Sequence, residues 1–354
     1  MKKIKLAIIG AGGIATDAHM PPLSEMTNVE VVAVCDIIPE KAEKLAKKYG
    51  IAEVYTDYRE VLKIPELDAV DICTPNYLHS IIAVEALEAG INVFCEKPDA
   101  ISAAESERMK VAAEKSGKTL MVMRNNRYFE TSKFLKSYIE DGKMGEIYAA
   151  RCGWQRRRGI PGKGGWFTTK EQSGGGPLID LGVHMIDLSM WLMGNPTPTT
   201  VSGSTYCKFA DTDVADSEHS AFGEKVDDGV FDVEDLAMGF VRFDNGTSMQ
   251  IEFSWASNVE REQFFVELRG TKAGALWNPM VGKFMIFTEE YGKTVDHTPN
   301  IDNGSVNVHG ANLKHFIDVL NGAEPQFVPQ QGVNMMKILE AIYKSAEMNK
   351  EIAL

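Results

Sequence analysis

The sequence is poor in cysteine, and the few cysteines it has do not form a recognisable site. They are five, an odd number, and include no C-x-x-C pair, which argues against a disulfide framework and against a zinc site. They stand at Cys35, Cys73, Cys95, Cys152 and Cys207. The first three each close an apolar run, as small buried residues do. We therefore expect a reducing compartment and no bound metal.

Long hydrophobic runs are also missing. No stretch approaches the roughly 18 apolar residues that a membrane helix needs. The apolar run within Met1–Gly10 is too short for a signal peptide and is typical of a first strand. These absences predict a cytoplasmic protein with no membrane partner.

Positive charge is in deficit. Lys and Arg number 37 against 50 Asp and Glu, a formal charge of -13. Nucleic-acid binding needs a basic surface, so this balance argues against a nucleic-acid partner, although it is compatible with a local basic pocket. The 354 residues, 44% hydrophobic and 25% charged, are ordinary for a globular protein and favour two domains.

Residues 1–123 alternate short apolar runs with amphipathic stretches. The runs are Lys5–Ile9, Val29–Cys35, Ala69–Cys73, Asn92–Cys95 and Thr119–Met123. The amphipathic stretches include Pro39–Tyr49, Leu78–Ala89 and Ser102–Ser116. Short runs that barely alternate are typical of strands buried on both faces of a parallel sheet. This part predicts an α/β Rossmann domain, a doubly wound parallel sheet, that ends near Arg124.

Residues 124–354 have a different organisation. Helical patterns cover Phe129–Glu140, Pro177–Met193, Ala311–Leu320 and Gly332–Asn349. Strand patterns without intervening helices cover Thr200–Phe209, Leu236–Phe243, Thr247–Ser254 and Gln263–Arg269. Asp244-Asn245-Gly246 predicts a hairpin turn, because Asn-Gly tolerates positive φ. We expect an α+β domain with a large open, mostly antiparallel sheet, and a long exposed loop over the acidic segment Asp211–Asp235.

A glycine loop directly follows the first run. Its pattern is G-x-G-x-x-A, and the residues that would contact a dinucleotide are Gly10, Gly12, Gly13, Ile14 and Ala15. Gly10 permits a tight turn, Gly12 lets the backbone approach a pyrophosphate, and Ala15 allows close packing. A merely structural glycine turn is the alternative. Pro21-Pro22 predicts that the following helix is irregular or restarts near Leu23.

Asp36 ends the second run, 21 residues beyond Ala15. A carboxylate there can accept hydrogen bonds from the adenosine ribose and would repel a 2′-phosphate. No arginine follows, since the next residues are Ile37 and Ile38. The pattern favours NAD over NADP as cofactor, and a solvated strand-end cap is the alternative role for Asp36.

Two further strand ends carry polar residues. Thr74, Pro75 and Asn76 follow the third strand, and Pro75-Asn76 can cap the next helix and present N–H groups near the cofactor. The fourth strand ends in Glu96-Lys97-Pro98. A lysine at a strand's carboxyl end lies at the binding crevice of such a sheet and can stabilise a developing alkoxide. A surface lysine is the usual alternative.

Asp180 and His184 stand four residues apart after a glycine run, with Asp187 nearby. On one helix they would share a face, and a histidine beside a carboxylate is a common general-base arrangement. A core histidine or a metal ligand are the alternatives, and the metal is disfavoured because no further ligand pair has a recognised spacing.

Arginines concentrate at residues 151 and 156–158 of this acidic protein. If Trp154–Arg158 continues a strand, Arg156 and Arg158 face together and Arg157 faces away. They would bind an acidic or polyhydroxylated substrate, or else form subunit salt bridges. Trp166 would stack on nicotinamide or on a sugar ring, or else anchor a surface loop.

Gly10–Ala15, Glu96-Lys97-Pro98 and Asp180…His184, in this order, resemble the Gfo/Idh/MocA family (glucose–fructose oxidoreductase, inositol dehydrogenase, rhizopine catabolism) over essentially the whole chain. The resemblance implies that Lys97 and His184 flank the substrate with Asp180 alongside, and that Arg127 and Tyr128 help to bind it. Positions that usually contact the cofactor in that family match Thr74, Pro75, Asn76, His79, Glu96, Lys97 and Arg127. It also implies a homo-oligomer, a dimer or tetramer.

The resemblance further implies an NAD-dependent dehydrogenase that oxidises a secondary hydroxyl of a sugar, cyclitol or glycoside, with C3 of a pyranose as one candidate position. His184 would accept the hydroxyl proton, Lys97 would steady the charge on oxygen, and Asp180 would orient the polar network; Lys97 as principal base is equally compatible. Two alternatives are an NAD-dependent glycosidase that oxidises transiently, eliminates and reduces again, and a non-catalytic NAD-binding regulator. The retained Lys97, Asp180 and His184 argue against the regulator.

Overall fold

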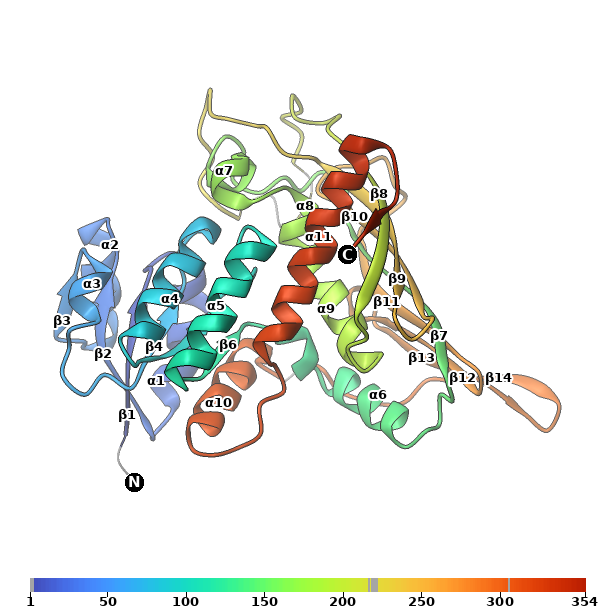
Figure 1. Ribbon diagram of the computed structural model, residues 1–354, viewed down its shortest axis with the longest axis horizontal. Helices are drawn as coiled ribbons and strands as arrows, with labels where there is room; N and C mark the ends of the chain where they lie inside the picture. The colour runs from blue at the N-terminus through green and yellow to red at the C-terminus, as the bar shows by residue number, and fades with distance from the viewer. Residues whose placement is uncertain (1–2, 216, 218–221, 305) are drawn as a thin grey trace. The chain divides into compact units, whose positions relative to one another are not determined.

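The computed structural model describes residues 3–215, 217, 222–304 and 306–354. Within these ranges no helix combines the length and the apolar character needed to span a membrane. The chain divides into two compact units, and Figure 1 shows the helices and strands of each. The first unit holds residues 1–125 and 307–333, and the second holds residues 126–306 and 334–354.

The first unit is built on a parallel sheet of six strands. They are β1 (Ile4–Ile9), β2 (Val29–Cys35), β3 (Glu53–Tyr55), β4 (Ala69–Ile72), β5 (Asn92–Cys95) and β6 (Leu120–Val122). Their order is β3-β2-β1-β4-β5-β6, and every neighbouring pair is parallel. In this doubly wound order, ligands bind where the strand order reverses, at the carboxyl ends of β1 and β4. The predicted Rossmann fold is confirmed.

Helices connect these strands. They are η1 (Ala15–His19), α1 (Met20–Glu25), α2 (Pro39–Tyr49), α3 (Tyr58–Val61), η2 (Asn76–Leu78), α4 (His79–Glu88) and α5 (Ala103–Ser116). A late segment, with α10 (Val308–Leu320), packs into the same unit. The Arg124 backbone N–H donates to Asn312 Oδ1 at 2.6 Å, and Gly332 lies against the Asp99 carboxylate. The first unit is therefore assembled from two separate stretches of chain.

Boundaries in the first 123 residues agree closely with the periodicity. Val29–Cys35, Asn92–Cys95 and Pro39–Tyr49 are confirmed to the residue. β3 was not predicted, because two of its three residues are exposed and it has no apolar run. The cap expected from Pro75-Asn76 is wrong in detail: η2 intervenes before α4, and its N-cap Pro75 makes no side-chain capping bond.

The helix after the glycine loop is irregular, as Pro21-Pro22 predicted. Ala15–His19 is a π-helical turn in which the Met20 N–H donates to the Ala15 carbonyl, five residues back. Regular α-helix restarts at Met20 rather than near Leu23, with the prolines in its first turn. Prolines lack an N–H, so the first turn is the place where a helix tolerates them.

The second unit is built on a mixed sheet of nine strands. They are β7 (Ile147–Gln155), β8 (Pro198–Tyr206), β9 (Leu236–Phe243), β10 (Ser248–Ser254), β11 (Gln263–Gly270), β12 (Ala273–Asn278), β13 (Lys283–Glu290), β14 (Lys293–His297) and β15 (Ile352–Ala353). Their order is β14-β13-β12-β11-β7-β10-β9-β8-β15. β10 pairs with β7 in parallel, and the other neighbouring pairs are antiparallel. The predicted α+β class with a mostly antiparallel sheet is confirmed.

The Asp244–Gly246 turn joins β9 to β10 as predicted, with the positive φ, +84°, at Gly246. The strands after Arg269 were not predicted, since they are short or carry polar residues at both ends. β13 and β14 are joined by Tyr291 and Gly292, both at positive φ (+53° and +69°), which is the geometry of a two-residue hairpin turn. That signal was missed because tyrosine seldom occupies such a position.

Helices of the second unit are η3 (Asn125–Tyr128), α6 (Glu130–Glu140), η4 (Trp166–Thr168), α7 (Lys170–Ser173), α8 (Pro177–Asp180), α9 (Gly182–Leu192) and η6 (Pro279–Val281). Most of α11 (Pro329–Met348) also belongs to it. Ile342 of α11 contacts the sheet where β8 and β9 carry Gly203 and Gly239. The helix predicted over Pro177–Met193 is interrupted at Leu181, where Gly182 packs closely against the Phe253 ring.

The segment Asp211–Asp235 lacks a named element among its described residues, as expected for a long loop between β8 and β9. The last residues of this loop are not exposed as predicted, because Val233, Glu234 and Asp235 are buried. Burial of two acidic residues requires partners. Asp235 accepts the N–H groups of Lys208 and Phe209, and Glu234 accepts those of Gly176 and Leu178.

Gly10→Ala should destabilise the protein more than Gly50→Ala. Both glycines have positive φ, +99° and +70°, where alanine costs about 1–2 kcal/mol. A Cβ on residue 10 would also lie 2.6 Å from the Cys73 carbonyl oxygen, whereas one on residue 50 would meet nothing within 4 Å. Urea denaturation should show the conformational cost alone for Gly50→Ala and a clearly larger loss for Gly10→Ala. Equal losses would contradict the close approach of β1 to β4.

Candidate active site

The glycine loop leaves open space at Gly12. A Cβ built there meets no atom within 4 Å, and one on Gly13 approaches the Asp17 carboxylate no closer than 4.0 Å. Ala15 is fully buried and Ile14 partly so. Helix-opening N–H groups bind phosphate readily when the backbone is accessible. The loop therefore fits the pyrophosphate of the predicted dinucleotide.

Asp36 lies against this loop. Its carboxylate accepts the N–H of Ala11 at 2.8 Å and the N–H of Ile38 at 2.9 Å. Each carboxylate oxygen has capacity for another donor, and the side chain is partly exposed. Asp36 thus acts as a backbone cap and also presents acceptors suited to ribose hydroxyls.

Thr74 lies beside the loop on the β4 side, since a Cβ on Gly10 would come within 3.0 Å of the Thr74 nitrogen. Its hydroxyl is buried and has no hydrogen-bond partner within the described residues. A buried hydroxyl in that state fits a group that bonds to a ligand. Asn76, one turn on, is buried at the start of η2.

Lys97 follows β5 on a turn held from two sides. The Lys97 N–H donates to Glu96 Oε2 at 3.0 Å. The ring of His79 lies with Nδ1 2.7 Å from the Pro98 carbonyl oxygen and Nε2 2.9 Å from that of Thr74. Burial lowers the pKa of His79, so the neutral ring donates to one of these carbonyls at a time. The turn is rigidly supported, and Lys97 is its partly exposed member.

Two residues behind this turn were missed by sequence reasoning. His19 and Asp71 are fully buried next to Glu96 and Cys73. The group resembles a metal-ligand set by its composition, but His19 Nδ1 and Asp71 Oδ2 are 2.8 Å apart. That is a direct hydrogen bond, shorter than the spacing of two ligands around one zinc ion. The signal that could have found them is an aspartate inside the apolar run Ala69–Cys73.

In the second unit, Asp180 ends α8 and His184 stands in the first turn of α9. They do not share one continuous helix, because Leu181 separates the two. Asp180 Oδ2 accepts the indole N–H of Trp255 at 2.9 Å, and the His184 ring centroid lies 5.7 Å from that of Trp154. A fixed carboxylate and an imidazole, each beside an indole, form a polar and aromatic lining.

Arg127 and Asp187 form a buried ion pair. Arg127 Nε donates to Asp187 Oδ2 at 2.8 Å and its terminal nitrogen donates to Oδ1 at 2.6 Å. The Arg127 guanidinium also lies 5.7 Å from the Trp191 ring. Tyr128 is buried beside them, and burial raises the pKa of its phenol. The structure therefore places Arg127 and Tyr128 in the core of the second unit.

The arginines after β7 do not continue its alternation, because the strand ends at Gln155. Arg156 is buried, donates to the Gly159 carbonyl and lies 5.3 Å from the Trp154 ring. Arg158 instead donates to Ser257 and Asn258. Trp166 stacks on Phe167 with ring centroids 3.8 Å apart. Among these residues, Arg156 lies beside the same Trp154 ring as His184 does.

Glu234 is a further residue that sequence reasoning missed. Its carboxylate accepts the N–H groups of Gly176 and Leu178, at 2.9 and 3.0 Å, and the hydroxyl of Tyr343 at 3.0 Å. Burial raises the pKa of Glu234, although these hydrogen bonds act to lower it. It thereby fixes the glycine run that leads into Asp180. No local pattern marks it, because it stands in an acidic segment whose earlier residues, such as Asp232, are exposed.

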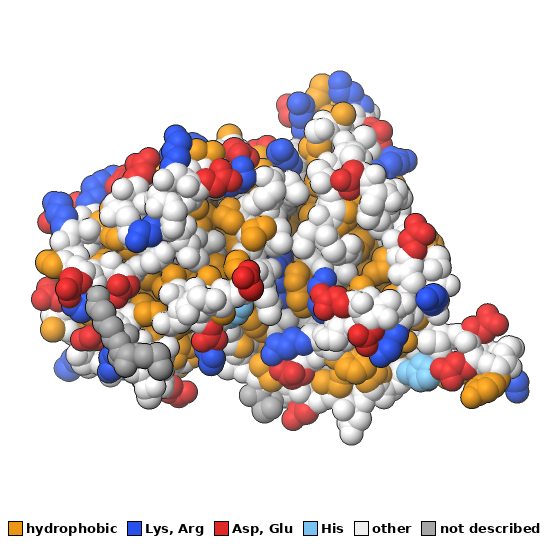
Figure 2. Space-filling model, turned by 60° about the horizontal axis from the view of Figure 1, so that its bottom comes forward, with side chains coloured by type: hydrophobic (Ala, Val, Ile, Leu, Met, Phe, Trp, Pro, Cys, Tyr) orange, Lys and Arg blue, Asp and Glu red, His pale blue; other side chains and the backbone are white. Residues whose placement is uncertain are grey.

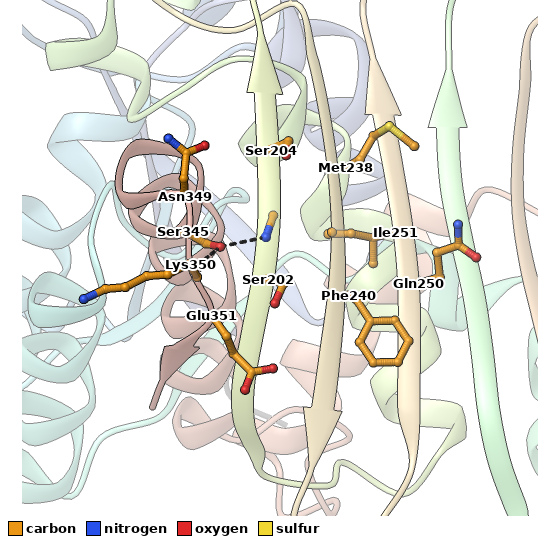
Figure 3. A pocket seen from close by; sticks show the side chains of 12 residues that line it. Ser202, Ser204, Met238, Phe240, Gln250, Ile251, Ser345, Asn349, Lys350 and Glu351 are labelled. Atoms are coloured by element: carbon orange, nitrogen blue, oxygen red, sulfur yellow. Dashed lines mark hydrogen bonds between the residues drawn. The ribbon is translucent and has the colours of Figure 1, made fainter.

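A groove on the sheet of the second unit, of about 540 Å³, lies apart from these residues (Figure 3). It is lined by β8 to β10, by the last turns of α11 and by the residues that follow, and Ser345 of α11 accepts the Gly203 N–H at 2.9 Å. Figure 2 shows acidic and basic side chains interspersed over one face of the molecule. None of the predicted site residues lines this groove.

Both parts of the chain match one family. The profile described as the oxidoreductase family, NAD-binding Rossmann fold, covers residues 4–124, and that of its C-terminal alpha/beta domain covers residues 136–354. D-glucoside 3-dehydrogenase of Escherichia coli (strain K12) is 33% identical over 353 residues, 99% of this chain and 97% of the relative.

Levoglucosan dehydrogenase of Pseudarthrobacter phenanthrenivorans is 30% identical over 294 residues, 78% of this chain and 74% of the relative. A solved levoglucosan dehydrogenase in complex with NADH and levoglucosan has a TM-score of 0.85 at 22% identity over 99% of both chains, which shows the shared fold. The chain therefore belongs to the Gfo/Idh/MocA oxidoreductase family and carries that family's NAD-binding Rossmann fold.

Proposed function

We propose that this protein is an NAD-dependent dehydrogenase that oxidises a secondary hydroxyl of a sugar or glycoside, at C3 of a pyranose ring. The position and substrate class are supported by the likeness to D-glucoside 3-dehydrogenase over nearly the full length of both chains. The cofactor is supported by the open glycine loop, by the Asp36 carboxylate and by the buried Thr74 hydroxyl.

The observation that carries the proposal is the selective exposure of the three predicted catalytic residues. His184 is partly exposed, whereas every other residue of α9 is buried. Lys97 is partly exposed between buried Glu96 and Pro98, and Asp180 is partly exposed after buried Ile179. Acidic and basic side chains that are partly exposed within an otherwise buried segment can contact a substrate. Their buried neighbours hold them in fixed positions.

The chemistry divides between the cofactor and the chain. NAD, when bound, accepts a hydride from the carbinol carbon. We assign His184 to accept the hydroxyl proton, Lys97 to stabilise the negative charge that develops on oxygen, and Asp180 to orient substrate hydroxyls through its fixed carboxylate. Lys97 as the principal base is the second assignment, and the variants below distinguish the two.

A glycosidase that oxidises transiently would use the same residues. In that case no net NADH accumulates, because the reduced cofactor returns its hydride within the turnover. A non-catalytic regulator is disfavoured because Lys97 and His184 are retained and are partly exposed.

Purified protein should form NADH with a glycoside or free pyranose, followed by absorbance across a panel of sugars, glycosides and inositols. With the best substrate, Lys97→Met and His184→Ala should each lower kcat by roughly 10²–10⁴-fold. His184→Ala should leave NAD affinity unchanged, since the residue belongs to the second unit. Near-normal turnover in His184→Ala would transfer the role of base to Lys97.

Two conservative controls fit this design. Lys63→Met removes an exposed lysine on the first unit, and His315→Ala removes a half-buried histidine of α10. Both should keep full turnover. Release of aglycone without NADH accumulation would instead identify the glycosidase.

NAD should bind more tightly than NADP, because the Asp36 carboxylate repels a 2′-phosphate. Calorimetric titration with both dinucleotides measures the difference. Asp36→Ala should weaken NAD binding and so reduce the difference between the NAD and NADP affinities. Glu53→Ala, which removes an exposed carboxylate on the adjacent strand β3, should leave that difference unchanged. Equal affinities in the unaltered protein would refute the assignment of Asp36.

We further propose a dimer or tetramer formed through the outer face of the second sheet. Met238 and Phe240 of β9 are each 38% exposed and alternate with buried Ala237 and Val241. Light scattering should give a multiple of 39.1 kDa. Phe240→Glu should lower the mass, and Tyr291→Glu, at an exposed hairpin tip, should not. A monomer at micromolar concentration would exclude this assembly.

A further inference from the structure

His19 is a fully buried histidine whose two ring nitrogens both face carboxylates. Nδ1 lies 2.8 Å from Asp71 Oδ2, and Nε2 lies 2.8 Å from Glu96 Oε1. The side chains of His19 and Asp71 are 0% exposed, and that of Glu96 is 7% exposed. The three residues come from η1, β4 and the end of β5. They join the helix after the glycine loop to the turn that carries Lys97.

The hydrogen bonds of this group limit where the protons can be. The other oxygen of Asp71 accepts the Cys73 thiol at 3.7 Å, and the other oxygen of Glu96 accepts the Lys97 N–H at 3.0 Å. With both acids ionised, their oxygens can only accept, and each ring nitrogen of His19 then donates. The geometry fits an imidazolium between two carboxylates.

The electrostatics agree with this assignment. Burial opposes a charge on His19, but the Asp71 carboxylate and the Cys73 sulfur outweigh it and raise the pKa of His19 well above its usual range. Burial likewise opposes ionisation of Glu96, yet the bond from His19 and the positive charge of His19 lower the pKa of Glu96 to about 2, with smaller contributions from His309 and Lys97.

His309 of α10 faces the group from the remaining side. Its ring centroid lies 6.5 Å from that of His19. Burial lowers the pKa of His309, so this ring is neutral and adds no second positive charge. The groups that face His19 are thus Asp71, Cys73, Glu96 and His309, and a single imidazolium is shared by the two acids.

We propose that His19 is a positioning residue for Lys97: its imidazolium keeps Glu96 ionised, and ionised Glu96 holds the Lys97 backbone and adds negative charge beside the lysine. This inference rests on the proposed role of Lys97 in the dehydrogenase reaction. A neutral residue at position 19 cannot donate to both acids. Glu96 would then take up a proton, and the Lys97 turn would lose a charged acceptor.

A second consequence concerns the protonation of Glu96. Burial opposes the ionisation of Glu96, and the bond and positive charge of His19 bring its pKa down to about 2. Without that charge the pKa of Glu96 should rise. Lowering the pH should then protonate Glu96 in His19→Gln and reduce kcat over a range where the wild type keeps it. A purely structural role for His19 would reduce kcat by the same factor at every pH.

The experiment combines His19→Gln, Glu96→Gln and the double variant in the NADH assay. We expect each single variant to lose kcat by about 10- to 100-fold, as outer partners of a functional group typically do. The double variant should lose little more than either single variant, because both changes act through one pathway. His79→Gln is the matched control: it removes a buried histidine of α4 whose ring bonds to the same turn but leaves Glu96 ionised, so kcat should show no additional loss at low pH.

The charge on His19 can be measured without any variant or substrate. Nitrogen NMR of histidine-labelled wild-type protein should show both His19 ring nitrogens protonated at pH 7 and above. A singly protonated ring at pH 7, multiplicative losses in the double variant or a loss of kcat in His19→Gln that does not grow at low pH would each overturn the proposal. If Lys97→Met keeps full turnover, the proposed function of Lys97 fails, and the NMR result still decides separately whether the imidazolium is present.

Discussion

The charge buried beneath the carboxyl ends of β4 and β5 is the constraint on which the first unit depends. Asp71 lies in the middle of a parallel sheet, where both faces are covered and water cannot compensate a carboxylate. The pairing with His19 supplies that compensation and joins η1, β4 and β5 through bonds of 2.8 Å. Removing one partner of such a buried pair typically costs about 3–5 kcal/mol, because the remaining charge is left uncompensated. The geometry of the glycine-loop helix and that of the Lys97 turn are therefore coupled.

The second unit solves the same physical problem with different residues. Arg127 and Asp187 neutralise each other through two bonds inside the core, and Glu234 uses backbone N–H groups and the Tyr343 hydroxyl as donors. Each buried charge fixes an irregular piece of chain: η3 in the first case and the glycine run before α8 in the second. Helical and strand hydrogen bonds cannot hold such pieces, so charged side chains take over that role.

Both units therefore place partly exposed polar residues on rigid, buried supports. Lys97 stands on a turn bonded by Glu96 and His79, and Asp180 is held by the Trp255 indole. A proton-transfer group loses catalytic power when its position varies by a fraction of an ångström, so a rigid support is part of the chemistry. The two histidines behind Lys97 differ in the direction of their pKa shifts. Burial opposes the charge on both rings, but the Asp71 carboxylate and the Cys73 sulfur raise the pKa of His19, whereas the carbonyl partners of His79 do not outweigh burial and its pKa is lowered.

Local sequence determined much of this protein. The apolar periods of β2, β5 and α2 predicted those elements to the residue, and the glycine pattern, Asp36 and Lys97 were located by their places at strand ends. These features depend on neighbours a few residues away, which a sequence displays directly. Tertiary structure alone decided that α10 joins the first unit, that β10 pairs with β7 in parallel, and that a break at Leu181 separates Asp180 from His184. It also brought His19 to Asp71 and Glu96, 52 and 77 residues away. Such pairs leave no periodic trace, because the partner of a buried charge is set by packing in three dimensions.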